Sequence, residues 1–451
     1  MEKIVVIGAG LCGSLMSLRL AQKGYQVEVF EKRPDMRKVS IVAGRSINLA
    51  LSNRGLKSLG MVGLKEKALE LVIPMRGRMI HGKDKSISFV PYSGREGEAI
   101  HSISRGGLNK LLLEEAENTG NVKFHFETDC TEVNPSKGKI KLHHLREHAF
   151  TDLDTDIILG TDGAYSAVRQ SMMRQSNSLR FDFSQQYLDA GYKELSIPCS
   201  ESGTFKMEKN ALHIWPREGF MLIALPNLDG SFTVTLFLPF TGEHSFESLN
   251  SDEKIWNFFH ENFPTALEHM PALIEDYHAN PTSALVTVKC FPWQANGTMA
   301  MMGDAAHAIV PFYGQGMNAS FEDCYVLDQC MHKFGKNWST VFQVYQSERK
   351  VNADAIADLA IDNFYEMRTA TADPVFTLKR KIELQLEQTY PDYFSKYSMV
   401  TFREDIPYID AMIKGRKQDA ILMKFAASLQ FPDAVELENI YHTLKKEVQT
   451  S

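Results

Sequence analysis

The sequence lacks the features of disulfide-bonded, zinc-ribbon and membrane-spanning proteins. Its six cysteines are scattered over 451 residues and no two are spaced as CxxC, which indicates reduced thiols. No run of 18 or more apolar residues occurs, and the opening MEKIVVIGAG does not have the regions of a signal peptide. We therefore expect a cytoplasmic protein that does not bind a membrane.

Excess positive charge is also missing. The 49 Lys and Arg against 56 Asp and Glu give a net charge of −7, which argues against nucleic acid as the main partner. His143, His144 and His148 lie in a predicted exposed hairpin without an acid or thiol at ligand spacing, so no metal site is expected. The length allows two or three domains with a large buried core.

What the sequence does have, at its start, is a strand, a glycine-rich turn and a helix. KIVVIG (3–8) predicts a buried strand, residues 11–24 a helix that ends at Gly24, and YQVEVFEK (25–32) a second strand. This βαβ order predicts a parallel sheet. Further along, the patterns predict one helical stretch over 53–71, a hairpin over 76–92, a helix over 104–120 and one strand over 121–133.

The pattern changes near residue 180. Four β-rich runs separated by Gly, Pro and Asn predict an antiparallel sheet inserted as a second domain: GYKELSI, ALHIWP, FMLIALP and SFTVTLFLPF. TMAMMGDAAH (298–307) then reads as a return to the first sheet, and helical patterns dominate from about 319. The expected domains are 1–180, 181–290, 291–370 and a helical region 371–451.

Three motifs carry chemistry, and the first is Gly8-x-Gly10-x-x-Gly13 between the first strand and helix. Its glycines suit a tight turn, close approach of a pyrophosphate and helix–strand packing. The phosphate would lie at the helix N-terminus, and Glu31, at the end of the second strand, can bind ribose hydroxyls. The alternative is a glycine-rich turn without a ligand.

The second motif, GTDGAYSAVR (160–169), places Asp162 after an apolar strand and Arg169 in the following helix. The acid can serve a ligand, or it can cap the helix and pair with Arg169; from these residues alone the two readings are equally good.

The third motif is GDAAHAIVPFYGQGMN (303–318). Asp304 can accept hydrogen bonds from ribose or ribityl hydroxyls, and Gly314, Gly316 and Asn318 can present N–H groups to a flat, electron-rich ring. For His307 we favour a structural role with a backbone partner.

Together the three motifs resemble those of class A flavoprotein aromatic hydroxylases, over residues 1 to about 370. The resemblance implies an α/β fold: a Rossmann-like FAD-binding domain, an inserted antiparallel β-sheet substrate domain and a helical C-terminal region. It also implies tightly bound, non-covalent FAD, held by Gly8, Gly10, Leu11, Gly13, Glu31, Lys32, Arg33, Arg105, Asp162, Asp304, Gly316, Met317 and Asn318. For Arg105, the alternative is a first-turn helix arginine facing solvent.

Further stretches resemble the kynurenine 3-monooxygenase family nearly end to end: GRSINLALS (44–52), MRGRMIH (75–81), VPY (90–92), HIWP (213–216), IALPNLDGSFTVTLF (223–237), VPFYGQGMN (310–318) and KYSMVTF (396–402). Two positions depart from the family. Ala308 stands where a proline is frequent, and Tyr313 where other aromatic or imidazole groups occur, so no general base is assigned there.

The resemblance implies that L-kynurenine is bound by Arg78, Tyr92, Asn363 and Tyr397. Arginine offers a planar fork that matches a carboxylate; alternatively Arg76 and Arg78, two apart, line one solvent face of a strand, and Arg76 has no assigned role.

The implied reaction is 3-hydroxylation with NADPH and O2 through a flavin C4a-hydroperoxide. No catalytic side chain is obligatory, with Gln315 and Tyr313 as pocket candidates. NADPH would bind transiently as a co-substrate. The sequence does not distinguish NADPH from NADH, and it does not decide between a monomer and a homodimer. Another aromatic substrate, or a non-catalytic flavin-binding redox protein, are the alternatives.

Overall fold

The computed structural model describes residues 2–38, 48–136, 138–369, 373–428 and 434–449. These residues form two compact units, each made of separate chain segments. Unit 1 comprises 1–72, 103–187 and 286–357, and unit 2 comprises 73–102, 188–285 and 358–451. The divisions near 187 and 285 lie close to the boundaries expected at 180 and 290, whereas the third division lies between residues 357 and 358 rather than at 370.

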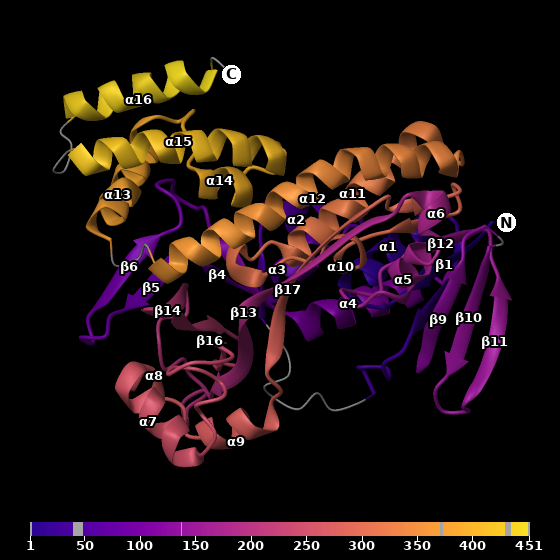
Figure 1. The fold of residues 1–451 in the computed structure, drawn as a ribbon, viewed down its shortest axis with the longest axis horizontal. Helices are drawn as coiled ribbons and strands as arrows, with labels where there is room; N and C mark the ends of the chain where they lie inside the picture. Colours follow the sequence, from indigo (N-terminus) through magenta and orange to yellow (C-terminus); the bar gives the residue numbers. More distant parts are fainter. Residues whose placement is uncertain (1, 39–47, 137, 370–372, 429–433, 450–451) are drawn as a thin grey trace. The chain divides into compact units, whose positions relative to one another are not determined.

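Unit 1 is built on a six-stranded sheet of order β18-β19-β12-β1-β2-β8 (Figure 1). Its strands are β1 (Lys3–Ile7), β2 (Gln26–Glu31), β8 (Val122–Phe126), β12 (Ile157–Gly160), β18 (Gln294–Ala295) and β19 (Met299–Met301). The strands pair in parallel from β19 to β8, and only the short β18 runs antiparallel. The late strand β19 beside β12 confirms that the chain returns to its first sheet near residue 300.

Helices cover this sheet, and the central strand is buried because apolar residues face both layers; Ile4, Val5 and Val6 are fully buried. The unit also contains β3 (Asn48–Leu51), α1 (Leu11–Gln22), α2 (Asn53–Met61), α3 (Lys65–Leu69), α4 (Arg105–Asn118), α5 (Ala167–Met173), α6 (Ser176–Leu179), α10 (Asp304–His307), the 3₁₀ turn η1 (Pro311–Tyr313) and α11 (Gly316–Phe334). The long helix α12 (Trp338–Thr369) begins in unit 1 and ends in unit 2.

Two expected continuous elements of unit 1 are broken. The helical stretch 53–71 is two helices, because Gly63 has φ 79° and ends the first one. The strand expected over 121–133 divides at Glu127, which has φ 55°. Its second part, β9 (Thr128–Asn134), leaves the six-stranded sheet and pairs with β10 (Lys139–His144), which pairs in turn with β11 (Ala149–Asp154).

Unit 2 is built on a seven-stranded sheet of order β17-β13-β16-β15-β14-β5-β6. Its strands are β5 (Gly77–His81), β6 (Ile87–Pro91), β13 (Asp182–Ile197), β14 (Ala211–Arg217), β15 (Phe220–Pro226), β16 (Phe232–Pro239) and β17 (Ser283–Phe291). β13, β16, β15 and β14 pair antiparallel, as expected, and the expected hairpin β5–β6 is present. This hairpin joins the inserted sheet through a parallel pairing of β14 with β5, which the sequence did not predict.

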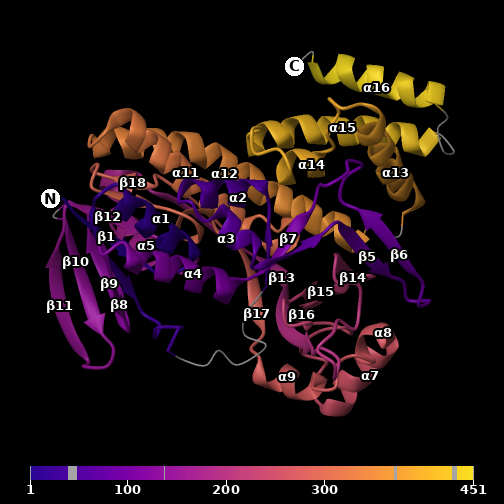
Figure 2. The same cartoon turned by 180° about the vertical axis from the view of Figure 1, so that it is seen from behind.

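Two groups of helices complete unit 2. The sequence analysis missed α7 (Asp252–Asn262), α8 (Pro264–Leu267) and α9 (Leu273–Ala279), which lie together beside the strands of this sheet (Figures 1 and 2). Their apolar side chains share a core with Trp215. The expected C-terminal helices are α13 (Pro374–Thr389), α14 (Lys396–Thr401), α15 (Tyr408–Ser428) and α16 (Ala434–Gln449), and the short strands β4 (Val72–Met75) and β7 (Ile100–Ser104) remain. Within the described ranges, no helix is both long and apolar enough to cross a membrane.

Candidate cofactor and substrate sites

In the glycine motif of unit 1, the first and third glycines are tightly packed and the middle glycine faces open space. Gly8 has φ 99°, and a Cβ there would lie 2.6 Å from the carbonyl oxygen of Thr161. A Cβ on Gly13 would lie 2.0 Å from the carbonyl oxygen of Gly8. Gly10, in contrast, has no neighbouring atom within 4 Å of its Cβ position. The outer glycines are therefore required for packing, and the middle one leaves space for a ligand.

The helix that follows this loop presents unused donors. Helix α1 begins after Gly10 without a side-chain cap from the described residues. Its first backbone bond there runs from the Ser14 N–H to the Gly10 carbonyl, 2.8 Å, so the N–H groups of residues 11–13 have no acceptor within the helix. These donors and the helix dipole suit a pyrophosphate.

Glu31, at the end of β2, is bound to the same loop. Its carboxylate accepts hydrogen bonds from the Ala9 N–H at 2.9 Å and from Arg33 Nε at 2.8 Å. Burial alone would raise the pKa of Glu31, but the bonds from Arg33 and the backbone lower it below the usual value. The side chain is thus an ionised acceptor at the loop, while Lys32 and Arg33 beside it are exposed.

Asp162 caps helix α5. It accepts hydrogen bonds from the Ser166 hydroxyl at 2.6 Å and from the Ala167 N–H at 2.7 Å. The alternative pairing of Asp162 with Arg169 was wrong, because the guanidinium donates to the carbonyl of Ala305 at 2.7 Å. Arg169 therefore ties α5 to the third motif, and a cofactor contact of Asp162 stays a prediction.

Asp304 begins α10, directly after Gly303, which has φ 58°. Asp304 is exposed, yet loss of hydration beside the surrounding protein raises its pKa; the positive charge of Arg105 opposes that increase. Arg105 is the exposed first residue of α4. Unit 1 thus brings an accessible acid and an accessible guanidinium into mutual electrostatic range.

The turn before α11 is held by Asn318. Its side-chain amide donates to the carbonyls of Ala50 (2.8 Å) and Gly314 (2.9 Å) and accepts from the Ser52 N–H (2.9 Å). The Asn318 side chain therefore works within the protein. The first-turn N–H groups of residues 316–318 precede the bond from Ala319 to Gln315 and remain the donors for a ligand.

Other predicted residues near this turn are buried. Tyr313 and Gln315 are 5% and 2% exposed, and Gly316 and Met317 open the helix. The stretch GRSINLALS, which carried part of the resemblance, is described only from residue 48, where β3 begins; residues 44–47 lie outside the described residues.

The sequence analysis missed a buried network of charges behind the third motif. His307 was expected to have a backbone partner, but its Nε2 lies 2.6 Å from the Asp323 carboxylate. Asp323 also accepts from the Gly303 N–H at 2.8 Å and from Arg349 Nε at 2.7 Å. Arg349 and Arg54 both bind Glu322, at 2.8 and 2.9 Å. The sequence feature that could have revealed this network is the presence of Asp323 and Arg349 within the apolar patterns of two helices, α11 and α12.

Unit 2 brings together three of the four residues predicted to bind substrate. Arg78 lies on β5, Tyr92 directly after β6, and Tyr397 on α14. The two tyrosine rings stack with centroids 5.3 Å apart and planes 9° apart. The Arg78 guanidinium carbon lies 5.3 Å from the centroid of Tyr92 and 5.2 Å from that of Tyr397. Asn363 lies buried on α12 in the same unit.

This cluster contains polar groups without partners. The Nε of Arg78 and the hydroxyl of Tyr92 are buried, and neither has a hydrogen-bond partner among the described residues. Burial raises the pKa of both Tyr92 and Tyr397; the nearby Arg78 charge opposes this increase but does not reach hydrogen-bond geometry with Tyr92. Buried polar groups are normally satisfied, so these two donors are available to a ligand. Arg76, in contrast, is exposed.

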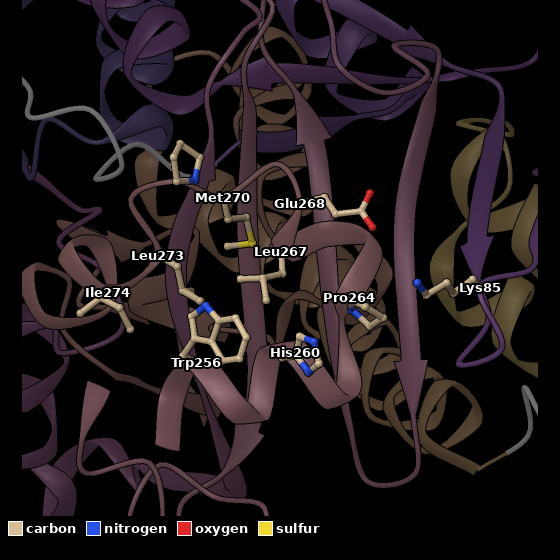
Figure 3. A pocket seen from close by; sticks show the side chains of 10 residues that line it. Lys85, Trp256, His260, Pro264, Leu267, Glu268, Met270, Leu273 and Ile274 are labelled. Carbon is tan, nitrogen blue, oxygen red and sulfur yellow. The ribbon is translucent and has the colours of Figure 1, made fainter. Parts of the chain in front are cut away.

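A surface hollow of about 480 Å³ lies elsewhere in unit 2, over α7–α9. Figure 3 shows its lining, which includes Trp256, His260 and Leu267. The Trp256 and His260 rings stack 4.8 Å apart. None of the residues predicted for cofactor or substrate lines this hollow. Among the described residues, no group of three or more His, Cys, Asp or Glu is arranged to hold a metal ion.

Comparisons with known proteins agree with this geometry. Residues 1–360 match the family model described as FAD binding domain. A kynurenine 3-monooxygenase of Flavobacterium johnsoniae is 48% identical over 98% of this chain and 96% of the relative. One from Dictyostelium discoideum is 44% identical over 93% of this chain and 92% of the relative.

Solved structures show the same fold at lower identity. The tetrameric form of 2-methyl-3-hydroxypyridine-5-carboxylic acid oxygenase superposes with a TM-score of 0.67 at 20% identity, covering 86% of this chain and 98% of that one. The architecture expected from the three motifs, an α/β FAD-binding fold with a helical C-terminal region, is thereby confirmed.

Proposed function

The chain belongs to the kynurenine 3-monooxygenase family of FAD-dependent monooxygenases, and we propose that it converts L-kynurenine to 3-hydroxy-L-kynurenine. The balanced reaction is L-kynurenine + NADPH + O2 + H⁺ → 3-hydroxy-L-kynurenine + NADP⁺ + H2O. The observation that carries the proposal is that the buried Nε of Arg78 and the buried hydroxyl of Tyr92 have no hydrogen-bond partner among the described residues, beside the stacked ring of Tyr397. These groups suit the α-carboxylate of an aromatic amino acid.

The residues of unit 1 fit FAD. The open space at Gly10 and the free N–H groups of residues 11–13 would hold the pyrophosphate, and Glu31 a ribose. Asp304, Arg105 and the first turn of α11 would hold the ribityl chain and ring. Bound FAD supplies the redox chemistry, which transfers electrons from NADPH and activates O2 for attack on an electron-rich ring.

The work of unit 2 is to bind and orient the substrate. Arg78 Nε donates a charge-assisted hydrogen bond to the substrate carboxylate, and the Tyr92 hydroxyl donates a second one. The raised pKa of Tyr92 keeps that hydroxyl protonated at neutral pH. Asn363 would bind the amino-acid part without adding charge. Because a fixed carboxylate fixes the ring, this set determines which carbon is hydroxylated.

No side chain is assigned as an obligatory acid or base. Tyr313 and Gln315 remain candidates for contacting a bound ring, since both are buried beside the first turn of α11. We propose small molecules as the reaction partners and a cytoplasmic location.

The test is stopped-flow absorbance of the purified flavoprotein with NADPH or NADH, with and without L-kynurenine, followed by mass analysis of the product. We expect faster flavin reduction with L-kynurenine and a product heavier by one oxygen atom. Flavin reduction that L-kynurenine does not accelerate, with peroxide as the only product, would contradict this substrate and favour another aromatic ring. Bound flavin without NAD(P)H oxidation under any condition would favour a non-catalytic redox protein.

A further inference from the structure

Glu387 is a buried carboxylate of unit 2 that bridges two separate backbone segments. It lies on α13 and is 2% exposed. One of its oxygens accepts from the Gly94 N–H at 2.9 Å, and the other accepts from the Ser395 N–H at 2.9 Å. Burial would raise the pKa of Glu387, but donors that include Ser398, Gly94 and Ser395 hold it below the usual value. An ionised carboxylate is therefore available to both N–H groups.

The two bridged residues flank the stacked tyrosines. Gly94 follows Tyr92 by two residues, and Ser395 precedes Tyr397 by two. A shift of either backbone segment would therefore move one ring of the stack against which the Arg78 guanidinium lies. Within the described part of the chain, Glu387 is the side chain that accepts from both N–H groups.

Close packing supports the same contact independently. A Cβ on Gly94 would lie 2.5 Å from the carbonyl oxygen of Leu384 and 3.0 Å from Cβ of Glu387. Residue 94 must therefore be glycine for this segment to approach α13 closely enough for the hydrogen bond. The glycine at position 94 and the hydrogen bond from its N–H to Glu387 therefore require the same close approach of the two segments.

A second residue of α13 acts on the same segment. Arg380, two helical turns before Glu387, donates to the carbonyl oxygen of Tyr92 at 2.8 Å and pairs with Glu383 at 3.1 Å. Arg95 donates to the carbonyl of Pro391 at 3.3 Å and also to that of Tyr393. The loop after β6 is thus attached to α13 and to the residues that lead into α14.

We propose that Glu387 is a positioning residue that holds Tyr92 and Tyr397 in register beside Arg78, and so sets the affinity for the carboxylate of the substrate. This inference rests on the proposed function for the identity of the substrate. The bridge joins groups of the protein itself, so it can be measured separately from substrate binding.

The test compares Glu387→Gln with Asp392→Asn in the FAD-loaded enzyme. Glutamine has the shape of glutamate but offers one acceptor oxygen, so one of the two N–H groups faces an amide NH2. Asp392 is a matched control: it bonds Tyr441 at 2.6 Å and Lys445 at 2.5 Å, on the exposed side of the same region. The measurements are amide exchange without substrate, the Kd for L-kynurenine, and KM and kcat separately.

We expect faster exchange at Gly94 and Ser395 in Glu387→Gln, and a Kd for L-kynurenine about tenfold higher, the loss of roughly one good hydrogen bond. KM should rise more than kcat falls, and FAD content should not change. Asp392→Asn should change none of these by more than about twofold. If Glu387→Gln is too unstable to purify, Glu387→Asp, which keeps the charge but shortens the reach, should shift the same measurements in the same direction.

Each outcome separates the bridge from the substrate assignment. Unchanged exchange in both Glu387 variants overturns the bridge, and faster exchange with an unchanged Kd overturns its role in binding. If the unmutated enzyme itself does not bind L-kynurenine, the proposed function fails and this inference fails with it, whereas the exchange measurement still decides whether Glu387 joins the two segments.

Discussion

The contacts of the Arg78 side chain indicate where a ligand would bind. Its guanidinium contacts two aromatic faces, and its Nε is buried without a partner among the described residues. A protein gains little stability from such a group, because desolvation of a charge is offset only in part by cation–π contacts. A ligand carboxylate that accepts a hydrogen bond from Nε would explain why an arginine is placed here.

Replacing Arg78 with alanine should weaken L-kynurenine binding by about 2–4 kcal/mol, because a charged hydrogen-bonding partner is lost. Arg78→Lys keeps the charge but not the planar fork, so its affinity for L-kynurenine should lie between that of the unmutated protein and that of Arg78→Ala. Equilibrium titration with L-kynurenine measures the effect, and the FAD content of each variant provides the control. An unchanged Kd for Arg78→Ala would remove this residue from the substrate site.

At the residue scale, sequence reasoning succeeded where a local backbone demand selects the residue type. Gly8 was assigned to a tight turn and Gly13 to helix–strand packing; Gly8 has φ 99°, and neither position has space for a side chain. It failed where the partner is distant in sequence. His307 was expected to bind backbone, whereas Asp323 and Arg349 complete its environment. No local pattern reports which charges meet when α11 and α12 pack together.

At the scale of elements, the pair β5 and β14 contains a histidine contact that should respond to pH. His81 Nε2 lies 2.9 Å from His213 Nδ1, and the His81 ring stacks on Trp215 at 4.1 Å. Burial lowers the pKa of His81 to about 4, and the positive charge of Arg217 acts in the same direction, as would protonation of His213 or His269. His81 is therefore neutral in the folded protein at neutral pH.

The sign follows from proton uptake. Between pH 6.5 and about 4 the unfolded chain binds a proton at this histidine and the folded chain does not, so stability falls as the pH falls through that window. Between pH 7 and pH 4.5 the loss should be roughly 2 kcal/mol for His81 alone. Urea unfolding from pH 7 to pH 4.5 measures it. His81→Gln, which can still bond His213 and does not titrate, should have a flatter profile; an equal slope would exclude His81 as the source.

The junction of α11 and α12 depends on buried charges. Replacing Arg349, which is 2% exposed, with methionine leaves Asp323 without one of its donors and should destabilise the protein by about 3–5 kcal/mol. The exposed pair of Arg416 with Asp362 is the control, and Arg416→Met should change stability by less than about 1 kcal/mol. Denaturant unfolding of both FAD-loaded variants decides this. Equal, small effects would show that the network is not needed for stability.

Element boundaries were predictable where hydrophobic periodicity was strong. The strands of the first βαβ unit and the runs of the inserted sheet were found from their patterns. The breaks at Gly63 and Glu127 were missed, since apolar periodicity continues through both and the interruption lies in the sign of φ. The parallel pairing of β14 with β5 was missed because it joins segments more than a hundred residues apart.

For the whole molecule, the predicted cofactor residues and the predicted substrate residues fall in different compact units. Ligands should therefore protect different parts of the chain. FAD added to cofactor-free protein should slow amide exchange in residues 8–14 and 303–319, and L-kynurenine added to the FAD-loaded enzyme should slow it in residues 76–95 and 393–402. Hydrogen exchange with mass spectrometry tests this. Protection by L-kynurenine confined to unit 1 would contradict the assignment of its carboxylate to Arg78.

The interrupted course of the chain has a consequence for the newly made protein. Unit 1 needs residues 286–357 before it is complete, and β12 has only β1 as a neighbour until β19 has been synthesised. At about 5–20 residues per second, the ribosome reaches residue 357 after roughly 20–70 s. From the synthesis of residue 160 until that of residue 299, roughly 7–28 s, the outer edge of β12 is open to other nascent strands. The order of synthesis, rather than the stability of the finished units, therefore sets how long this edge is at risk of mispairing.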